Sequence, residues 1–162
     1  MKTLLLILAL ANGTVSTKTV TIKNAKGDVI GRAEITALAK GVKVEVTARN
    51  MTPGEHAIHF HEKGSCVAPG FSSAGEHFAP ATKHHGFDSK DGQHAGDMPN
   101  FYVGQDGSAK AEFVNTSVTL AGGANSLTRG EGTSLVIHEK ADDYKTQPSG
   151  DSGARIACGE IR

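Results

Sequence analysis

Histidine is concentrated in this chain at spacings that suit the binding of two metal ions. Six of the eight histidines, together with one aspartate, form the candidate set: His59, His61, His77, His85, His94, Asp97 and His138. Imidazole is the usual side-chain ligand for copper and zinc, and carboxylate is a workable further ligand for zinc. The set therefore predicts a two-metal site, and it is the strongest functional indication in the sequence.

The first group of ligands would come from two extended segments. His59 and His61 are two residues apart, so in a strand both side chains point to one face while Phe60 points to the other. His138 ends a second strand pattern, and a neighbouring strand could bring it to the same place. Taken alone, each feature has a plainer interpretation: the histidine pair is incidental, and His138 is an ordinary polar strand end.

The second group lies within a single loop. It combines three imidazoles with one carboxylate: His77, His85, His94 and Asp97. This donor set suits tetrahedral zinc, and four protein ligands leave no open position, which is typical of a structural zinc site. The alternative is a polar, solvated loop, which would make the first group a coincidence as well.

The elements that must position these residues are short strands. Apolar and polar residues alternate with a period of two, most clearly at Val42, Val44 and Val46. Eight strands are predicted, over residues 19–22, 29–35, 42–48, 56–61, 101–104, 109–114, 133–138 and 155–161. No segment shows a clear helical period. The sequence therefore predicts an all-β fold, an eight-stranded antiparallel Greek-key β-barrel or flattened sandwich.

Two connections between these strands are too long for ordinary hairpins. They span residues 62–100 and 139–154. Loops of this length in a compact domain are usually functional or disordered. The first loop contains four of the seven candidate ligands, which favours function.

Length, charge and the N-terminal segment restrict the class of protein. The 162 residues support one domain, and the balance of 17 basic and 17 acidic residues indicates no nucleic-acid partner. Lys2 precedes a short apolar run over residues 3–11, which is typical of a secretory signal and too short for a transmembrane anchor. We therefore predict a signal peptide over residues 1–11 and an exported domain over residues 12–162 (secreted, periplasmic or at the cell surface). The alternative is a buried N-terminal strand or helix.

The two cysteines, Cys66 and Cys158, are most simply a disulfide if the protein is exported. The alternative is two unrelated buried thiols.

Several segments resemble the copper/zinc superoxide dismutase family, and its bacterial members in particular. They are FHEKGSC, SSAGEHFAP, KHHGF, HAGDMPN, VIHEKADD and GDSGARIACG, and the resemblance runs from about Val20 to Ile161. It implies copper at His59, His61, His77 and His138, and zinc at His77, His85, His94 and Asp97.

The resemblance also implies roles for individual residues. His77 would bridge the two metals and be catalytic, as would Arg155, which matches an arginine beside copper. Asp142 matches a carboxylate that hydrogen-bonds a copper-binding and a zinc-binding imidazole. The pair Cys66–Cys158 matches the family disulfide, which anchors the metal loop.

By this resemblance the protein is an enzyme that dismutates superoxide, a small-molecule substrate, to dioxygen and hydrogen peroxide, with a homodimer allowed. One alternative is a catalytically silent relative that binds zinc or carries copper, although all four copper-type histidines are present. A hydrolase with two zinc ions would lack an evident general base. The loop between His138 and Arg155 is shorter than in eukaryotic members; Lys145 is a candidate there for attracting superoxide, and the alternative is an ordinary solvated lysine.

Overall fold

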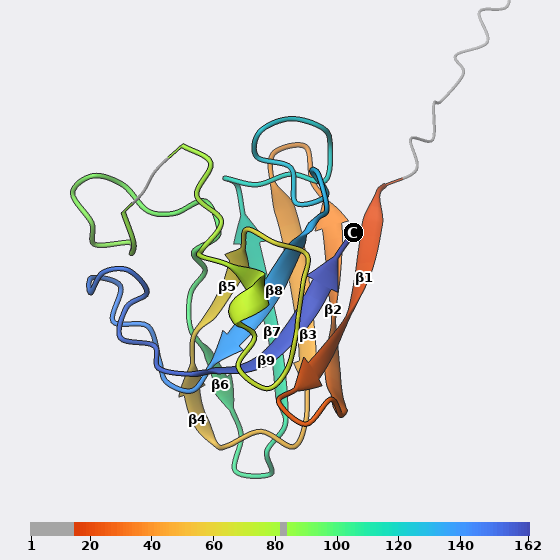
Figure 1. The fold of residues 1–162 in the computed structure, drawn as a ribbon, viewed down its shortest axis with the longest axis vertical. Coiled ribbons are helices and arrows are strands. Elements are labelled where there is room, and N and C mark those ends of the chain that lie inside the picture. The colour runs from red at the N-terminus through yellow and green to blue at the C-terminus, as the bar shows by residue number, and fades with distance from the viewer. Residues whose placement is uncertain (1–14, 82–83) are drawn as a thin grey trace, which may run out of the picture.

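The computed structural model describes residues 15–81 and 84–162 (Figure 1). The predicted signal peptide, residues 1–11, lies outside the described residues. Within them the protein consists of nine strands and one short 3-10 helix, η1 (Ser72–Ala74), so the all-β prediction is confirmed. No helix in that part of the chain is long and apolar enough to cross a membrane.

Seven of the eight predicted strands lie within two residues of observed ones. The strands are β1 (Thr17–Asn24), β2 (Val29–Ala37), β3 (Val42–Ala48), β4 (Gly54–His56), β5 (Ile58–His61), β6 (Phe101–Val103), β7 (Ala109–Asn115), β8 (Thr133–His138) and β9 (Arg155–Ile161). The exception is the run 56–61, which was expected as one strand and is divided at Ala57. The N–H of Ala57 donates to the Lys140 carbonyl (2.8 Å) and its carbonyl accepts the N–H of His138 (2.9 Å), so the chain leaves one sheet here and enters the other.

The strands form two antiparallel sheets. The larger has the order β5-β8-β9-β1-β2-β3-β7, and β4 pairs with β6 in the smaller. β6 contacts β7 at one edge of the large sheet, and β4 leads directly into β5 at its other edge. Figure 1 shows the large sheet strongly twisted: β8 and β9 run diagonally across the view, whereas β2 and β3 run nearly vertically. The Greek-key barrel stays a prediction.

Alternating side chains on these strands build the core. On β3 the buried residues Val42, Val44 and Val46 alternate with more exposed ones, as the sequence predicted. They pack in one large cluster with aromatic residues such as Phe60 and Phe78. A second, small cluster lies under the Cys66 segment and contains Phe71, Ala74, Val136 and Cys158.

Both long connections occupy the predicted ranges, 62–100 between β5 and β6 and 139–154 between β8 and β9. In Figure 1 the first part of the 62–100 connection, with η1, crosses the middle of the view, while its later green part and the blue 139–154 connection lie at the left. Strands β5 and β8 are direct neighbours, with His59 opposite Val136 and His61 opposite Ser134. The fold therefore brings both predicted ligand groups to one side of the sheet edge.

Candidate metal centre

Backbone hydrogen bonds bring three segments of the chain together at β5. The N–H of Phe60 donates to the Gly96 carbonyl (2.9 Å), that of Phe78 to the Phe60 carbonyl (2.8 Å) and that of Gly96 to the Phe78 carbonyl (2.8 Å). A side-chain carbon at Gly96 would overlap the Phe60 carbonyl, so only glycine allows this close approach. Four of the candidate ligands adjoin these three residues, and His61 is paired with His77 and His59 with Asp97 by backbone bridges.

The first ligand group is assembled and buried. His59, His61, His77 and His138 each offer a ring nitrogen within 4.8 Å of the others. Their rings lie in contact: the centroid of His77 is 4.1 Å from that of His59 and 4.9 Å from that of His61. All four side chains are at most 6% exposed.

One nitrogen of each of these four rings has no hydrogen-bond partner. They are Nδ1 of His59 and Nε2 of His61, His77 and His138. Among the described residues, Ser134 Oγ is the one other buried side-chain atom in this state. Each such buried group costs about 1–3 kcal/mol when it is left unsatisfied. Four nitrogen lone pairs in one buried cluster form a set of ligands for a metal ion, and nitrogen ligands of this kind suit copper.

The other nitrogen of each ring is held by a hydrogen bond, which orients the ring. The Nε2–H of His59 donates to Asp142 (2.9 Å) and the Nδ1–H of His61 to the Gly75 carbonyl (3.0 Å). The Nδ1 of His138 lies 3.1 Å from the Ser152 hydroxyl. Such outer partners fix the tautomer and aim of a metal-binding imidazole.

The second ligand group converges on one carboxylate oxygen. The Nδ1 atoms of His77, His85 and His94 lie 3.0, 3.2 and 3.4 Å from Oδ1 of Asp97. The Nδ1 atoms of His77 and His94 are 3.4 Å apart. Oδ2 of Asp97 accepts the backbone N–H groups of Gly86 (2.9 Å) and His94 (3.1 Å), which fixes the carboxylate.

These separations fit a tetrahedral zinc ion. With bonds of about 2.0 Å, the four ligand atoms of a tetrahedral site lie about 3.3 Å apart. The observed spacing of 3.0–3.4 Å matches the edges of that tetrahedron. Three nitrogen atoms and one oxygen atom are a donor set that zinc prefers. The loop therefore presents a closed, four-ligand site.

Asp142 joins the two groups. One carboxylate oxygen accepts from Nε2 of His59 and the other from Nε2 of His85, each at 2.9 Å, so the contact predicted from the sequence is present. Asn100 holds the backbone of Asp142 at two points, through its side-chain amide N–H (2.9 Å) and its side-chain oxygen (2.8 Å). The N–H of Tyr144 donates to the same carboxylate at 2.6 Å.

Protonation differs between His85 and the rings of the first ligand group. Burial lowers the pKa of His77 to about 3 and that of His138 to about 4, and it also lowers the pKa of His59 and His61. These four rings are therefore neutral near pH 7, which is the form that binds a metal. Although burial opposes it, hydrogen bonds to Asp142 and Asp97 raise the pKa of His85 to about 9.

Arg155 lies at the edge of the first group. Its guanidinium donates to the Phe71 carbonyl (2.9 Å) and to the Gly75 carbonyl (2.7 Å), which also accepts from His61. The Cys66–Cys158 disulfide, with a Cα–Cα distance of 5.7 Å, links the loop that contains the Phe71 and Gly75 carbonyls to β9. Burial lowers the pKa of Arg155 below its ordinary value, and the group stays cationic near pH 7.

Several partners of the site were not anticipated from the sequence. They are Asn100, Ser152 and the carbonyl of Gly75. His56, for which the sequence suggested no role, is buried, and its ring nitrogens face the carbonyls of Thr52 (2.8 Å) and His138 (2.7 Å).

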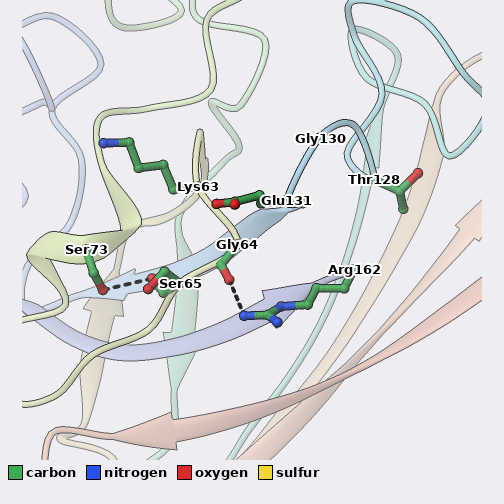
Figure 2. Close-up of a pocket in the computed structure, with 9 residues that line it drawn as sticks. Lys63, Gly64, Ser65, Ser73, Thr128, Gly130, Glu131 and Arg162 are labelled. Atoms are coloured by element: carbon green, nitrogen blue, oxygen red, sulfur yellow. Dashed lines mark hydrogen bonds between the residues drawn. The ribbon is translucent and has the colours of Figure 1, made fainter.

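Other polar features stand apart from the centre. His84 is exposed, with its ring 3.8 Å from Asp91, and so is separate from the neighbouring His85. A pocket of about 630 Å3 is lined by Lys63, Glu131 and Arg162 among others, and none of the ligand histidines reaches it. In Figure 2 the Arg162 guanidinium there donates to the Gly64 carbonyl (3.0 Å).

Comparison with known proteins agrees with this centre. The family model for copper/zinc superoxide dismutase matches residues 12–161. Superoxide dismutase (Cu-Zn) 2 of Aquifex aeolicus is 47% identical over 141 residues, 86% of this chain and 82% of that protein. Superoxide dismutase (Cu-Zn) of Caulobacter vibrioides is 43% identical over 147 residues, 89% of this chain and 84% of that protein.

Solved structures show the same fold. A SOD-like protein from Bacillus subtilis superimposes with a TM-score of 0.85 at 41% identity, covering 89% of this chain and 97% of that one. The Cu/Zn superoxide dismutase from Brucella abortus gives 0.75 at 28% identity, covering 91% and 100%. On the family match and these relatives together, the chain belongs to the copper/zinc superoxide dismutase family.

Proposed function

We propose that this protein is a superoxide dismutase, with copper at the first ligand group and zinc at the second. The observation that carries the proposal is the set of four buried ring nitrogens without a partner, which surround one position. Their ligands in this assignment are His59, His61, His77 and His138. Bound copper would supply the one-electron redox chemistry that turns two superoxide ions and two protons into dioxygen and hydrogen peroxide.

The zinc assignment rests on the second group. Its ligands are His77, His85, His94 and Asp97, and their spacing matches a tetrahedral site. Four protein ligands leave no open position, so this site organises the loop 62–100. Its backbone contacts with β5 hold the ring of His77 next to His59 and His61.

His77 belongs to both groups. Its Nδ1 faces Asp97 on the zinc side, and its Nε2 is buried without a partner in a ring that lies next to the copper-side rings of His59 and His61. With Nδ1 held, Nε2 is the atom that can take up a proton beside the substrate and release it to the product. A bridging role for His77 is therefore part of the proposal.

Arg155 would hold the anionic substrate. Its two hydrogen bonds to backbone carbonyls, one shared with His61, fix a cation next to the copper-side rings. A fixed guanidinium offers charge and N–H donors to an oxyanion without reorganisation.

The test is to load the purified protein with copper and zinc and to assay superoxide dismutation. His61→Ala should abolish copper binding and activity but keep zinc, because the outer nitrogen of His61 contacts the Gly75 carbonyl and no zinc-side residue. The matched control is His84→Ala, at an exposed histidine, which should match the wild type.

A catalytically silent relative is the alternative, and a curated relative from Bacillus subtilis, 41% identical over 145 residues, is named superoxide dismutase-like. A protein with a full equivalent of bound copper and no dismutase activity would establish that alternative for this chain.

Export and assembly are further parts of the proposal. Disulfides persist in oxidising compartments, so the Cys66–Cys158 bond supports export, with cleavage before Asn12. Mass spectrometry of the mature N-terminus tests it, and an intact Met1 in exported material would contradict the signal. A homodimer is allowed by the family resemblance, and sedimentation equilibrium measures it.

A further inference from the structure

His138 differs from the other copper-side histidines in the partner of its outer nitrogen. The outer nitrogens of His59 and His61 face a carboxylate and a backbone carbonyl, at 2.9 and 3.0 Å. The Nδ1 of His138 faces a hydroxyl, that of Ser152 at 3.1 Å, and the Gly153 carbonyl at 3.4 Å. Hydrogen bonds from N–H to oxygen normally span 2.7–3.2 Å, so the serine hydroxyl is the nearer and stronger partner and the glycine carbonyl is a second, longer one.

Backbone hydrogen bonds fix the position of Ser152. Its side chain is fully buried. Its carbonyl accepts the N–H of Lys140 (2.9 Å), and the N–H of Glu139 donates to the Ala154 carbonyl (2.8 Å). The two residues after His138 are thus joined to the segment before Arg155. Ser152 holds the backbone next to His138 through its carbonyl and the ring through its hydroxyl.

The two acceptors determine which ring nitrogen carries the proton. The Gly153 carbonyl can only accept a hydrogen bond, so a neutral His138 must carry its proton on Nδ1. The Ser152 oxygen then accepts from the same N–H. This tautomer leaves the lone pair on Nε2, the atom that faces the other rings without a partner.

We propose that Ser152 is a positioning residue for copper: its hydroxyl, the nearer of two acceptors for the Nδ1–H of His138, holds the ring in the orientation that aims Nε2 at the copper position. This inference rests on the proposed function, which assigns His138 to copper. Loss of the Ser152 hydroxyl should therefore affect copper binding and not zinc binding, because the hydroxyl contacts the copper side of the centre and no zinc-side ligand among the described residues.

The experiment compares Ser152→Ala with Ser149→Ala in zinc-loaded protein. Ser149 lies in the same loop, and its hydroxyl makes no hydrogen bond within residues 15–81 and 84–162. Copper affinity is measured by competition with a chelator, and the cupric form is recorded by electron paramagnetic resonance. Loss of an outer partner weakens metal binding by about 10- to 100-fold. We expect that loss and an altered copper spectrum for Ser152→Ala, neither for Ser149→Ala, and unchanged zinc affinity in both.

The outcomes separate this inference from the proposed function. Wild-type protein that binds no copper, or His61→Ala protein that binds it normally, would overturn the proposed function. Normal copper affinity and an unchanged spectrum in folded Ser152→Ala protein would overturn the role of Ser152 alone. If Ser152→Ala does not fold, long-range proton–nitrogen NMR of the metal-free wild type decides: a proton on Nδ1 of His138 supports the inference, and one on Nε2 refutes it.

Discussion

Gly150→Ala should disrupt both metal sites through one added methyl group. Gly150 has φ +69°, and a side-chain carbon there would overlap Oδ1 of Asp142 and lie 2.6 Å from its Cγ. It would also lie 2.8 Å from Nε2 of His85. Real contacts of this kind are not found below 3.0 Å, so the Asp142 carboxylate must move.

The magnitude follows from what the carboxylate holds. Its displacement breaks hydrogen bonds to His59 and His85, and bonds to charged groups are worth about 1.5–3 kcal/mol each. The left-handed backbone adds about 1–2 kcal/mol of strain for alanine. We therefore expect a loss of roughly 4–8 kcal/mol in the free energy of unfolding of the loaded protein. The affinities for copper and zinc should each fall by about 10- to 100-fold.

The matched control is Gly27→Ala. Gly27 has φ +87° but open space around it, so this variant measures backbone strain without the overlap. Chelator competition gives the two metal affinities, and urea unfolding gives stability. The reasoning fails if Gly150→Ala binds both metals as the wild type does, or if its loss of stability equals that of Gly27→Ala.

Three further predictions concern the arginine, the disulfide and acid. Arg155→Ala should lower dismutase activity by on the order of 10- to 100-fold at low salt with both metals retained, and unchanged activity would remove its role in holding the anion. Cys66→Ser removes the disulfide that closes a loop with a sequence separation of 92. The chain-entropy model then gives a decrease of about 4.6 kcal/mol in the free energy of unfolding. An unchanged urea midpoint under oxidising conditions would contradict this. The metal-free protein should lose stability as pH falls below about 6.5, because the unfolded chain then takes up protons that native His77 and His138, with pKa values of about 3 and 4, do not. Each such ring contributes a slope of about 1.4 kcal/mol per pH unit, and a urea midpoint that is constant from pH 6.5 to 4.5 would refute this.

The strands of the sheet and the spacing of the ligands could be predicted from the sequence because both follow from local periodicity. The alternation at Val42, Val44 and Val46 fixes which face of β3 is buried, and it did so as predicted. The two-residue step from His59 to His61 likewise places both rings on one side. The division of the run 56–61 at Ala57 could not be predicted, since it depends on hydrogen bonds to residues about 80 positions away.

The hydrogen-bond partners of the ligand side chains could be predicted from the sequence only in part. Asp142 was found by its match to a family motif, whereas Asn100, Ser152 and the Gly75 carbonyl lie in irregular loops without a periodic pattern. Their positions depend on the path of each loop, and that path is set by backbone bonds such as that between Lys140 and Ser152. Composition carries no signal for such contacts.

The most direct test of the metal centre is anomalous X-ray diffraction from crystals of the loaded protein, with data collected at the copper and zinc absorption edges. We expect two separate peaks, copper among His59, His61, His77 and His138, and zinc among His77, His85, His94 and Asp97, with the His77 ring between them. A single peak, or a copper peak elsewhere while Nε2 of His77 faces solvent, would contradict this expectation.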